Sequence, residues 1–199
     1  NQMQKDATLS AAEAAGMGKI ALMQEPVAAV MSVMRHRKGD GTFLVYDLGG
    51  GTLDIAIAES INGRVSLLAH GGIAMCGGRD FDRIILDQIV KPWLLENFDL
   101  ADDFSTDSKY ATLRYMATWA SEKAKIELSS TTSSEINLPY IMPVNGIPKH
   151  LVRSLTKAKF EQLTEDLVKR TIEPCKNALS NAGLTIGEID EIILVGGST

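Results

Sequence analysis

Residues 42–59 read TFLVYDLGGGTLDIAIAE, and they contain the strongest structural signal in the chain. Their first seven residues form an apolar run that is typical of a buried strand, and the alternating segment LDIAIAE predicts a second strand. The three glycines of residues 49–51 join the two strands in a tight turn. Asn62-Gly63 then predicts a hairpin, whose returning strand should cover residues 65–69. The stretch therefore predicts an antiparallel meander with a glycine loop at one end.

The glycine loop lies between two carboxylates, and this combination points to a phosphate and metal site. Successive glycines let backbone N–H groups converge on phosphate oxygens, because no Cβ is in the way. Asp47 and Asp54 would repel a bare phosphate, so we expect Mg²⁺ to intervene, with the carboxylates holding its water shell. Thr52 can add a hydroxyl to a phosphate, and the chain contains no Walker A sequence. A plain glycine-rich hairpin is the alternative, but it does not explain the two aspartates.

A second candidate group combines a carboxylate, an ammonium and a hydroxyl. Glu122, Lys125 and Ser129 are spaced i, i+3, i+7, so on a helix all three fall on one stripe. Such a stripe can hydrogen-bond a purine and a ribose. The alternative is a solvated helix face with one exposed ion pair, which contributes at most about 1 kcal/mol.

Two further candidates are less specific. Gly196 and Gly197 follow a predicted strand, and glycines that leave a strand often bring the backbone against a nucleotide. Any strand-to-helix turn can carry glycine, so this signal is ambiguous by itself. Glu25 precedes Pro26 at the start of a predicted helix, where the helix dipole alone also favours a carboxylate.

The remaining segments indicate two architectures. The segments before residue 79 and after residue 152 predict one architecture, in which helices alternate with strands. Residues 79–152 differ, because they predict two helices and a small sheet, as in an inserted subdomain. The acidic segment 100–107 is expected to be a loop. Helices are predicted over 6–18, 27–34, 81–95, 110–128 and from Thr156, the last kinked by Pro174 and ended by Gly183; strands are predicted over 20–23, 136–140, 150–155 and 191–195.

Composition excludes several classes of protein. The 199 residues are 45% hydrophobic with a net charge of −5 and a pI near 5.2, which argues against a nucleic-acid or anionic-membrane surface. Cys76 and Cys175 have no metal or disulfide pattern around them and predict a reducing compartment. No segment predicts a membrane span or a secretory leader. The chain runs from Asn1 to Thr199 directly after a strand, so we expect a fragment.

Five segments in order resemble one known family: QEPVAAV, VYDLGGGTLDIAI, GGRDFD, SEKAKIELSS and EIILVGGST. Together they resemble the ATPase domain of the DnaK-type seventy-kilodalton heat-shock chaperones, within the actin, hexokinase and sugar-kinase superfamily. The resemblance implies an α/β fold: the second lobe of an actin-like (ribonuclease H-like) ATPase, with a mixed sheet, helices and a small inserted α+β subdomain. It implies a first-lobe remnant over 1–38, a nucleotide-binding core over 39–78 and 153–199, and the subdomain over 79–152.

The same resemblance implies ATP or ADP and Mg²⁺ as cofactors, and it assigns a role to each candidate residue. Glu25 would orient the attacking water, Asp47 would act on metal-bound water, and Asp54 would lie near the metal. Lys125 would belong to an adenosine clamp. The implied phosphate-binding residues are Gly49, Gly50, Gly51 and Thr52; those lining the nucleotide approach are Gly77 and Gly78; and those around the adenosine are Glu122, Lys125, Ser129, Gly196, Gly197 and Ser198.

The resemblance also implies partners and a setting. The small subdomain would dock a nucleotide-exchange factor, while a J-domain co-chaperone and unfolded peptide clients would act on the full-length parent, a cytoplasmic chaperone of protein folding and the stress response. The parent would be an ATPase, and the fragment alone is expected to be inactive because the family's first phosphate loop and catalytic lysine are missing from it.

Three departures from the family pattern leave alternatives open. Arg79 replaces the usual acidic residue, Val27 stands where threonine is usual, and residues 71–76 differ from the usual Gly-Asp-Thr-His-Leu. These changes are compatible with a degenerate interaction module that does not hydrolyse ATP. An actin-superfamily scaffold or cytoskeletal ATPase is the other alternative.

Overall fold

The computed structural model describes residues 2–36, 39–98, 106–139, 141, 143–144 and 147–199. Its centre is a four-stranded mixed sheet in the order β3-β2-β1-β8. β1 (Gly41–Leu48), β2 (Thr52–Ile61) and β3 (Arg64–Ala74) form an antiparallel meander, and β8 (Glu191–Val195) lies parallel to β1. Asn62 and Gly63 both have positive φ in the hairpin turn. The predicted meander, its turn and the last strand are therefore confirmed.

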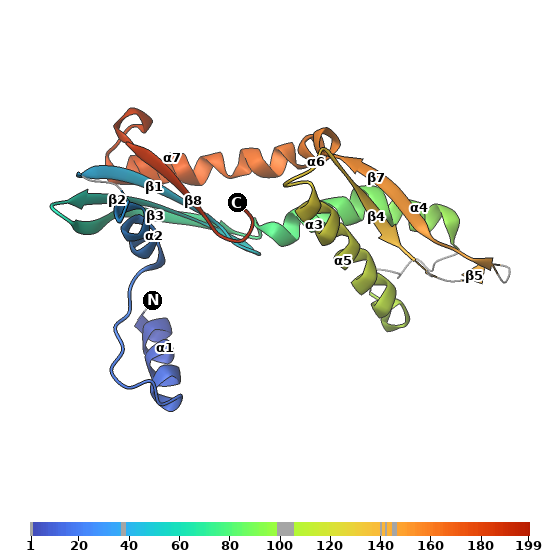
Figure 1. Ribbon diagram of the computed structural model, residues 1–199, viewed down its shortest axis with the longest axis horizontal. Helices are drawn as coiled ribbons and strands as arrows, with labels where there is room; N and C mark the ends of the chain where they lie inside the picture. Colours follow the sequence, from blue (N-terminus) through green and yellow to red (C-terminus); the bar gives the residue numbers. More distant parts are fainter. Residues whose placement is uncertain (1, 37–38, 99–105, 140, 142, 145–146) are drawn as a thin grey trace.

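Helices cover both faces of this sheet, which is the middle layer of three (Figure 1). The layers follow from the alternation of strand side chains between the two faces. Phe43 lies on one face, in a core with Val30 of α2 (Glu25–Met34). Leu44 lies on the other face, in a core with residues of α7 (Ile172–Ala182). The sequence therefore places α2 on the face that also carries the aspartates of β1 and β2.

A second hydrophobic core lies away from the sheet, in the right half of Figure 1. Ile85, Ala117, Ile136 and Leu151 are completely buried in it. β4 and β7 pair antiparallel, and every second residue of β4 is buried, as expected for a strand with one face on a core. The elements of this region are α3 (Gly78–Ile85), η1 (Leu86–Val90), α4 (Lys91–Asn97), η2 (Ser108–Tyr110), α5 (Ala111–Glu127), β4 (Ser133–Leu138), β5 (Pro143–Val144), β6 (Ile147–Pro148) and β7 (Leu151–Thr156).

One helix, α6 (Lys157–Arg170), connects the two regions. Near its start, Phe160 packs against the second core; near its end, Leu167 is buried in the core between the sheet and α7. Thr156 caps the helix, its hydroxyl accepting a hydrogen bond of 3.2 Å from Lys159 N. The predicted helix start at Thr156 is confirmed.

The helix ends near Pro174 and Gly183 resemble those predicted from the sequence. Gly183 has a φ of 68° and ends α7 in the left-handed conformation that glycine adopts without strain. The interruption between α6 and α7 falls at Thr171, ahead of Pro174. Pro174 thus lies in the first turn of a new helix, where its missing N–H removes no helical hydrogen bond.

Two predicted elements differ from the structure. Residues 20–23 form no strand, because none of the described strands pairs with them. The helix predicted over 81–95 contains a π turn at Leu86–Val90, just before Pro92, whose nitrogen cannot donate a hydrogen bond. Most of the acidic segment 100–107 lies outside the described residues.

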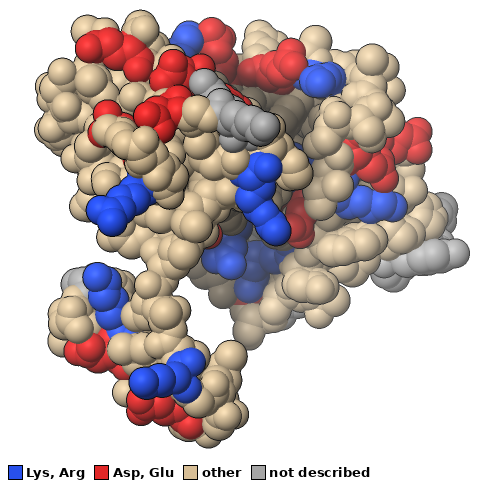
Figure 2. All heavy atoms as spheres, turned by 60° about the vertical axis from the view of Figure 1, so that its left-hand side comes forward, with Lys and Arg blue, Asp and Glu red and all other residues tan. Residues whose placement is uncertain are grey.

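The first helix, α1 (Gln2–Ala14), projects from the α2 side of the sheet, where Gln4 borders a pocket, and it buries none of its residues (Figure 1). Gly16 and Gly18 follow it with positive φ, as the predicted stop requires. On the face shown in Figure 2, basic side chains lie among acidic ones instead of forming one continuous patch. Among the described residues, no helix is both long and apolar enough to span a membrane.

Candidate functional site

The glycine turn between β1 and β2 is bound to the start of α3. Gly49 N donates to Thr52 O at 2.9 Å, which closes the turn. Gly78 N donates to Gly49 O at 3.0 Å, and Arg79 N donates to Gly50 O at 2.9 Å. These bonds join segments almost thirty residues apart and hold the turn in one conformation. The two glycine motifs that the sequence singled out therefore form one structure.

The glycines of this structure serve two different purposes. A Cβ on Gly77 would lie 2.6 Å from both Gly49 O and Gly51 N, so close packing of backbone on backbone excludes any side chain there. A Cβ on Gly50 or Gly51 would meet nothing within 4 Å. On the side where a side chain would stand, these two glycines face open space, which allows a ligand to approach the backbone closely.

The turn after β8 packs against the same place. Gly196 has a φ of 96°, and a Cβ there would collide with Leu48 O and lie 2.6 Å from Asp47 Oδ1. Ser198 N donates to Leu48 O at 3.1 Å. A Cβ on Gly78 would in turn collide with Ser198 Oγ. Segment 196–198 is thus brought beside both glycine motifs, at the junction of the sheet and the second core (Figure 1).

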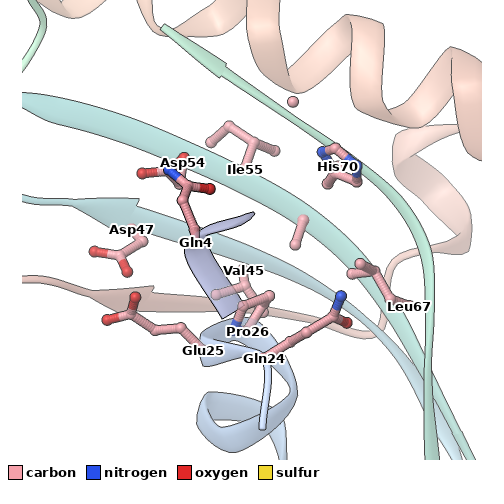
Figure 3. A pocket seen from close by; sticks show the side chains of 12 residues that line it. Gln4, Gln24, Glu25, Pro26, Val45, Asp47, Asp54, Ile55, Leu67 and His70 are labelled. Atoms are coloured by element: carbon pink, nitrogen blue, oxygen red, sulfur yellow. The ribbon is translucent and has the colours of Figure 1, made fainter. Parts of the chain in front are cut away.

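Three carboxylates line one open pocket of about 580 Å³ on the α2 side of the sheet. Asp47 and Asp54 are direct partners across the β1–β2 ladder, so both project on the same face. Glu25 is the first residue of α2, which lies on that face. Figure 3 shows all three carboxylates turned toward one side of the pocket, with Leu67 and His70 on the other.

The donor set of this pocket fits a water-mediated magnesium ion better than a fully protein-held metal. Within the described part of the chain, no group of three or more His, Cys, Asp or Glu side chains is arranged to hold a metal ion. Mg²⁺ keeps several waters and binds through one or two carboxylates together with substrate phosphates. Asp47 and Asp54 supply hard oxygen atoms of that kind beside the glycine turn.

Lys125 reaches from α5 across to α3. Its Nζ donates to Gly78 O at 3.0 Å and lies 2.8 Å from Asp82 Oδ1. Glu122 lies one turn earlier on α5 and is exposed. Ser129 is not on the helix, because α5 ends at Glu127 and Ser129 N donates to Ile126 O in the turn that follows. The single helical stripe expected from spacing is therefore interrupted before its last member.

Asp82 is the residue of this cluster that the sequence analysis did not select. It is 5% exposed, and burial raises the pKa of its carboxyl, whereas the neighbouring Lys125 ammonium lowers that pKa and the charge of Glu122 raises it further. The sequence contained a signal for Asp82 as a site residue, since Asp82 ends the GGRDFD motif and follows Gly78 by one helical turn.

Thr52 lies at the edge of the site, and the two cysteines, which the sequence does not predict to be site residues, lie in or against the core. Thr52 begins β2 and is exposed. Cys76 is completely buried and Cys175 partly so, and burial raises the pKa of both thiols. Both cysteines lie in or against the core between the sheet and α7, as expected for small apolar residues.

One comparison with known proteins gives a match along the whole chain. The family model described as Hsp70 protein matches the chain over residues 1–199.

Proposed function

The chain belongs to the Hsp70 family and is part of the ATP-binding domain of a chaperone, and from this premise we propose how its residues hold the nucleotide. The family has the actin-like ATPase fold, and the mixed sheet with its flanking helices is the core of that fold here. In our proposal the backbone of Gly49, Gly50 and Gly51, with the hydroxyl of Thr52, holds the β- and γ-phosphates.

The observation that carries this proposal is the convergence of three distant segments. Backbone hydrogen bonds of 2.9–3.1 Å join the turn at 49–51 to the start of α3, and Leu48, directly before that turn, to segment 196–198. A set of backbone groups fixed in this way is preorganised, so binding an anion there requires little reordering. Gly77 and Gly78 then line the approach to the phosphates.

In this proposal the carboxylates bind the metal ion and orient the attacking water. Asp47 and Asp54 would hold Mg²⁺ through its water shell, and the ion when bound supplies positive charge beside the phosphates. Glu25 accepts a hydrogen bond from the attacking water and orients it. Hydrolysis then rests on positioning and charge stabilisation for in-line attack on the γ-phosphate.

The adenosine lies between α5 and the end of β8. Lys125, with Glu122 and Ser129, binds it from one side, and Gly196, Gly197 and Ser198 face it from the other. Support comes from the position of Lys125 Nζ, which is 3.0 Å from Gly78 O. A Cβ built on Gly78 would lie 3.2 Å from Lys125 Nζ and would collide with Ser198 Oγ, so both side chains border this glycine. The two halves of the clamp therefore approach each other at Gly78.

We further propose that this chain alone binds nucleotide weakly and turns it over negligibly. Among the described residues that line the carboxylate pocket, there are three carboxylates and no Lys or Arg. Charge developing on the γ-phosphate in the transition state thus has no cationic side chain in that pocket to stabilise it.

Proteins of this family act with co-chaperones on client proteins. For this chain we propose three parts: a segment 1–38 from the first lobe, a nucleotide-binding core formed by 39–78 and 153–199, and a small subdomain, 79–152. We propose that a nucleotide-exchange factor docks on the small subdomain. A J-domain co-chaperone and unfolded peptides would act on the parent protein, which we place in the cytoplasm and in the stress response.

Calorimetric titration of Mg-ADP into this chain tests the proposed nucleotide site. We expect saturable binding that Lys125→Ala weakens about tenfold or more, because it removes a charged hydrogen-bond donor from the clamp. Lys123→Ala is the matched control, since Lys123 lies on the same helix with its side chain 59% exposed, 3.8 Å from Glu127. Equal affinity of the wild type and Lys125→Ala would refute the clamp, and an absence of binding would refute the site in this chain.

A further inference from the structure

The contact between α3 and α5 contains a buried ion pair that no role proposed above requires. Asp82 Oδ1 and Lys125 Nζ are 2.8 Å apart, with side chains only 7% and 19% exposed. No hydrogen bond of good geometry reaches Asp82 Oδ1 from the described residues, so the Lys125 ammonium acts on it as a counter-charge. The other lysine ion pairs in the described part of the chain lie on exposed helix surfaces.

Stability alone is a poor reason for such a pair. Removing two charges from water carries a desolvation penalty that their attraction often does no more than offset. Burial raises the pKa of the Asp82 carboxyl although Lys125 lies beside it, which is the sign of that penalty. A buried pair of this kind is better explained by what it positions.

The pair determines where the Lys125 ammonium lies. An ammonium has three N–H donors. In the described structure, one is directed to Gly78 O at 3.0 Å, and the ammonium lies 2.8 Å from Asp82 Oδ1 as an ion pair. Both acceptors belong to the first two turns of α3, and Ser198 Oγ borders the same glycine. The ammonium therefore keeps donor capacity for a ligand at the point where α3, α5 and segment 196–198 meet.

We propose that Asp82 is a positioning residue for nucleotide binding, acting through Lys125. Its carboxylate draws the flexible four-carbon side chain of Lys125 across from α5 and holds the ammonium against Gly78 O, so that the remaining donor points to the ligand. Lysine loses much rotamer entropy when it is fixed, and Asp82 causes that loss before the nucleotide arrives. The inference rests on the proposed nucleotide site and adds a residue to it.

A double-mutant cycle tests the inference, with Mg-ADP affinity of the full chain measured by calorimetry. Asp82→Asn keeps the shape of the side chain and removes its charge, and we expect it to weaken binding about tenfold. In the Lys125→Ala background the same change should have no further effect, because its target is gone. The matched control is Asp87→Asn, an exposed carboxylate on the adjoining η1 turn, which should bind like the wild type.

Three results would overturn the inference, and they are distinguishable. Binding that is lost in Lys125→Ala but unchanged in Asp82→Asn would remove Asp82 and leave the proposed site standing. Equal weakening by Asp82→Asn in both backgrounds would indicate a general structural role. No saturable binding by the wild type would remove the proposed site and this inference together.

A conservative variant keeps the test decisive if Asp82→Asn does not fold. Asp82→Glu retains the charge and moves it by one methylene group, so we expect a smaller loss of affinity, again absent in the Lys125→Ala background. Thermal unfolding followed by circular dichroism identifies which variants are folded. Loss of affinity by folded Asp82→Glu that persists without Lys125 would contradict the inference.

Discussion

At the scale of single residues, the site depends on which glycines touch their surroundings. Gly77 is enclosed by the backbone of the glycine turn, and a Cβ there would be 2.6 Å from Gly49 O and Gly51 N. Gly187 lies outside the site, where a Cβ would be 3.9 Å from Thr185 Oγ1, an ordinary contact. Replacement by alanine should therefore destabilise the chain at Gly77 and have little effect at Gly187.

Gly77→Ala should destabilise the chain by about 1–3 kcal/mol, because backbone atoms cannot move aside as a flexible side chain can. It should also weaken Mg-ADP binding, since the displaced turn carries the proposed phosphate ligands. Chemical denaturation gives the free energy of unfolding, and calorimetry gives the affinity. Gly187→Ala is the control and should change the free energy of unfolding by no more than about 0.5 kcal/mol. Equal stability of the two variants would contradict the packing argument.

The cysteines should react slowly with thiol reagents. Burial raises the pKa of Cys76 and of Cys175, and a raised pKa leaves less of the reactive thiolate at pH 8. Cys76 is completely buried, so it should be modified more slowly than the partly buried Cys175. Absorbance during reaction with a disulfide reagent, for Cys76→Ala and Cys175→Ala separately, measures each rate. Rapid modification of both in the folded chain would contradict their assignment to the core.

At the scale of elements, local hydrogen bonds at helix ends define where several segments begin and stop. Thr156 caps α6, and Gly183 ends α7. A capping box starts η3 (Ile186–Glu188): Thr185 N and Thr185 Oγ1 donate to Glu188 Oε2 at 2.8 and 2.7 Å. This box lies directly before β8, the strand that leads into segment 196–198.

The capping box predicts a pH dependence. The bonds from the Thr185 backbone and hydroxyl lower the pKa of Glu188 from its ordinary value of 4.5, so the charged carboxylate is favoured in the folded state. Its stabilising contribution is present in full above pH 4.5 and disappears as the pH falls through the lowered pKa. Thermal unfolding of wild type and Glu188→Gln should differ at pH 7, with the wild type more stable, and converge in acid. A difference that stays constant with pH would contradict this prediction.

At the scale of the whole molecule, the candidate site lies where two separately packed regions meet. The sheet and its helices form one region, the second core forms another, and α6 touches both. The carboxylate pocket lies on the α2 face, while Lys125 approaches from α5. Negative charge thus lies on the sheet side of the site, and the described lining residues there include no Lys or Arg.

This separation predicts that nucleotide binding depends on the metal. Removing Mg²⁺ with EDTA should weaken ADP binding about tenfold or more, because Asp47, Asp54 and Glu25 then repel the phosphates. Asp54→Asn removes one negative charge, so it should weaken Mg-ADP binding but strengthen binding of metal-free ADP. Calorimetry with and without Mg²⁺ measures both effects. Equal affinity for ADP and Mg-ADP would contradict the assigned role of the aspartates.

Local signals in the sequence determined much of the fold and of the candidate site. The alternation around residues 42–59, the Asn62-Gly63 turn and the cap at Thr156 each depend on neighbours in the chain, so each could be read from it. The motifs also identified Asp47, Asp54 and the glycines as one candidate site; in the structure the two aspartates line one pocket, and the glycine turn joins the strands that carry them. Their roles in binding and catalysis remain predictions.

Only the tertiary structure decided how distant segments pair. Residues 20–23 have the composition of a strand, but a strand forms only against a partner, and none of the described strands lies beside them. Ser129 has helical spacing from Lys125, but α5 stops first. The pairing of Asp82 with Lys125 joins residues 43 positions apart on two helices. Sequence alone determined the elements and the chemistry of the motifs because periodicity and turn preferences are local; the partners of Lys125 depend on distances through space, which only the packed chain defines.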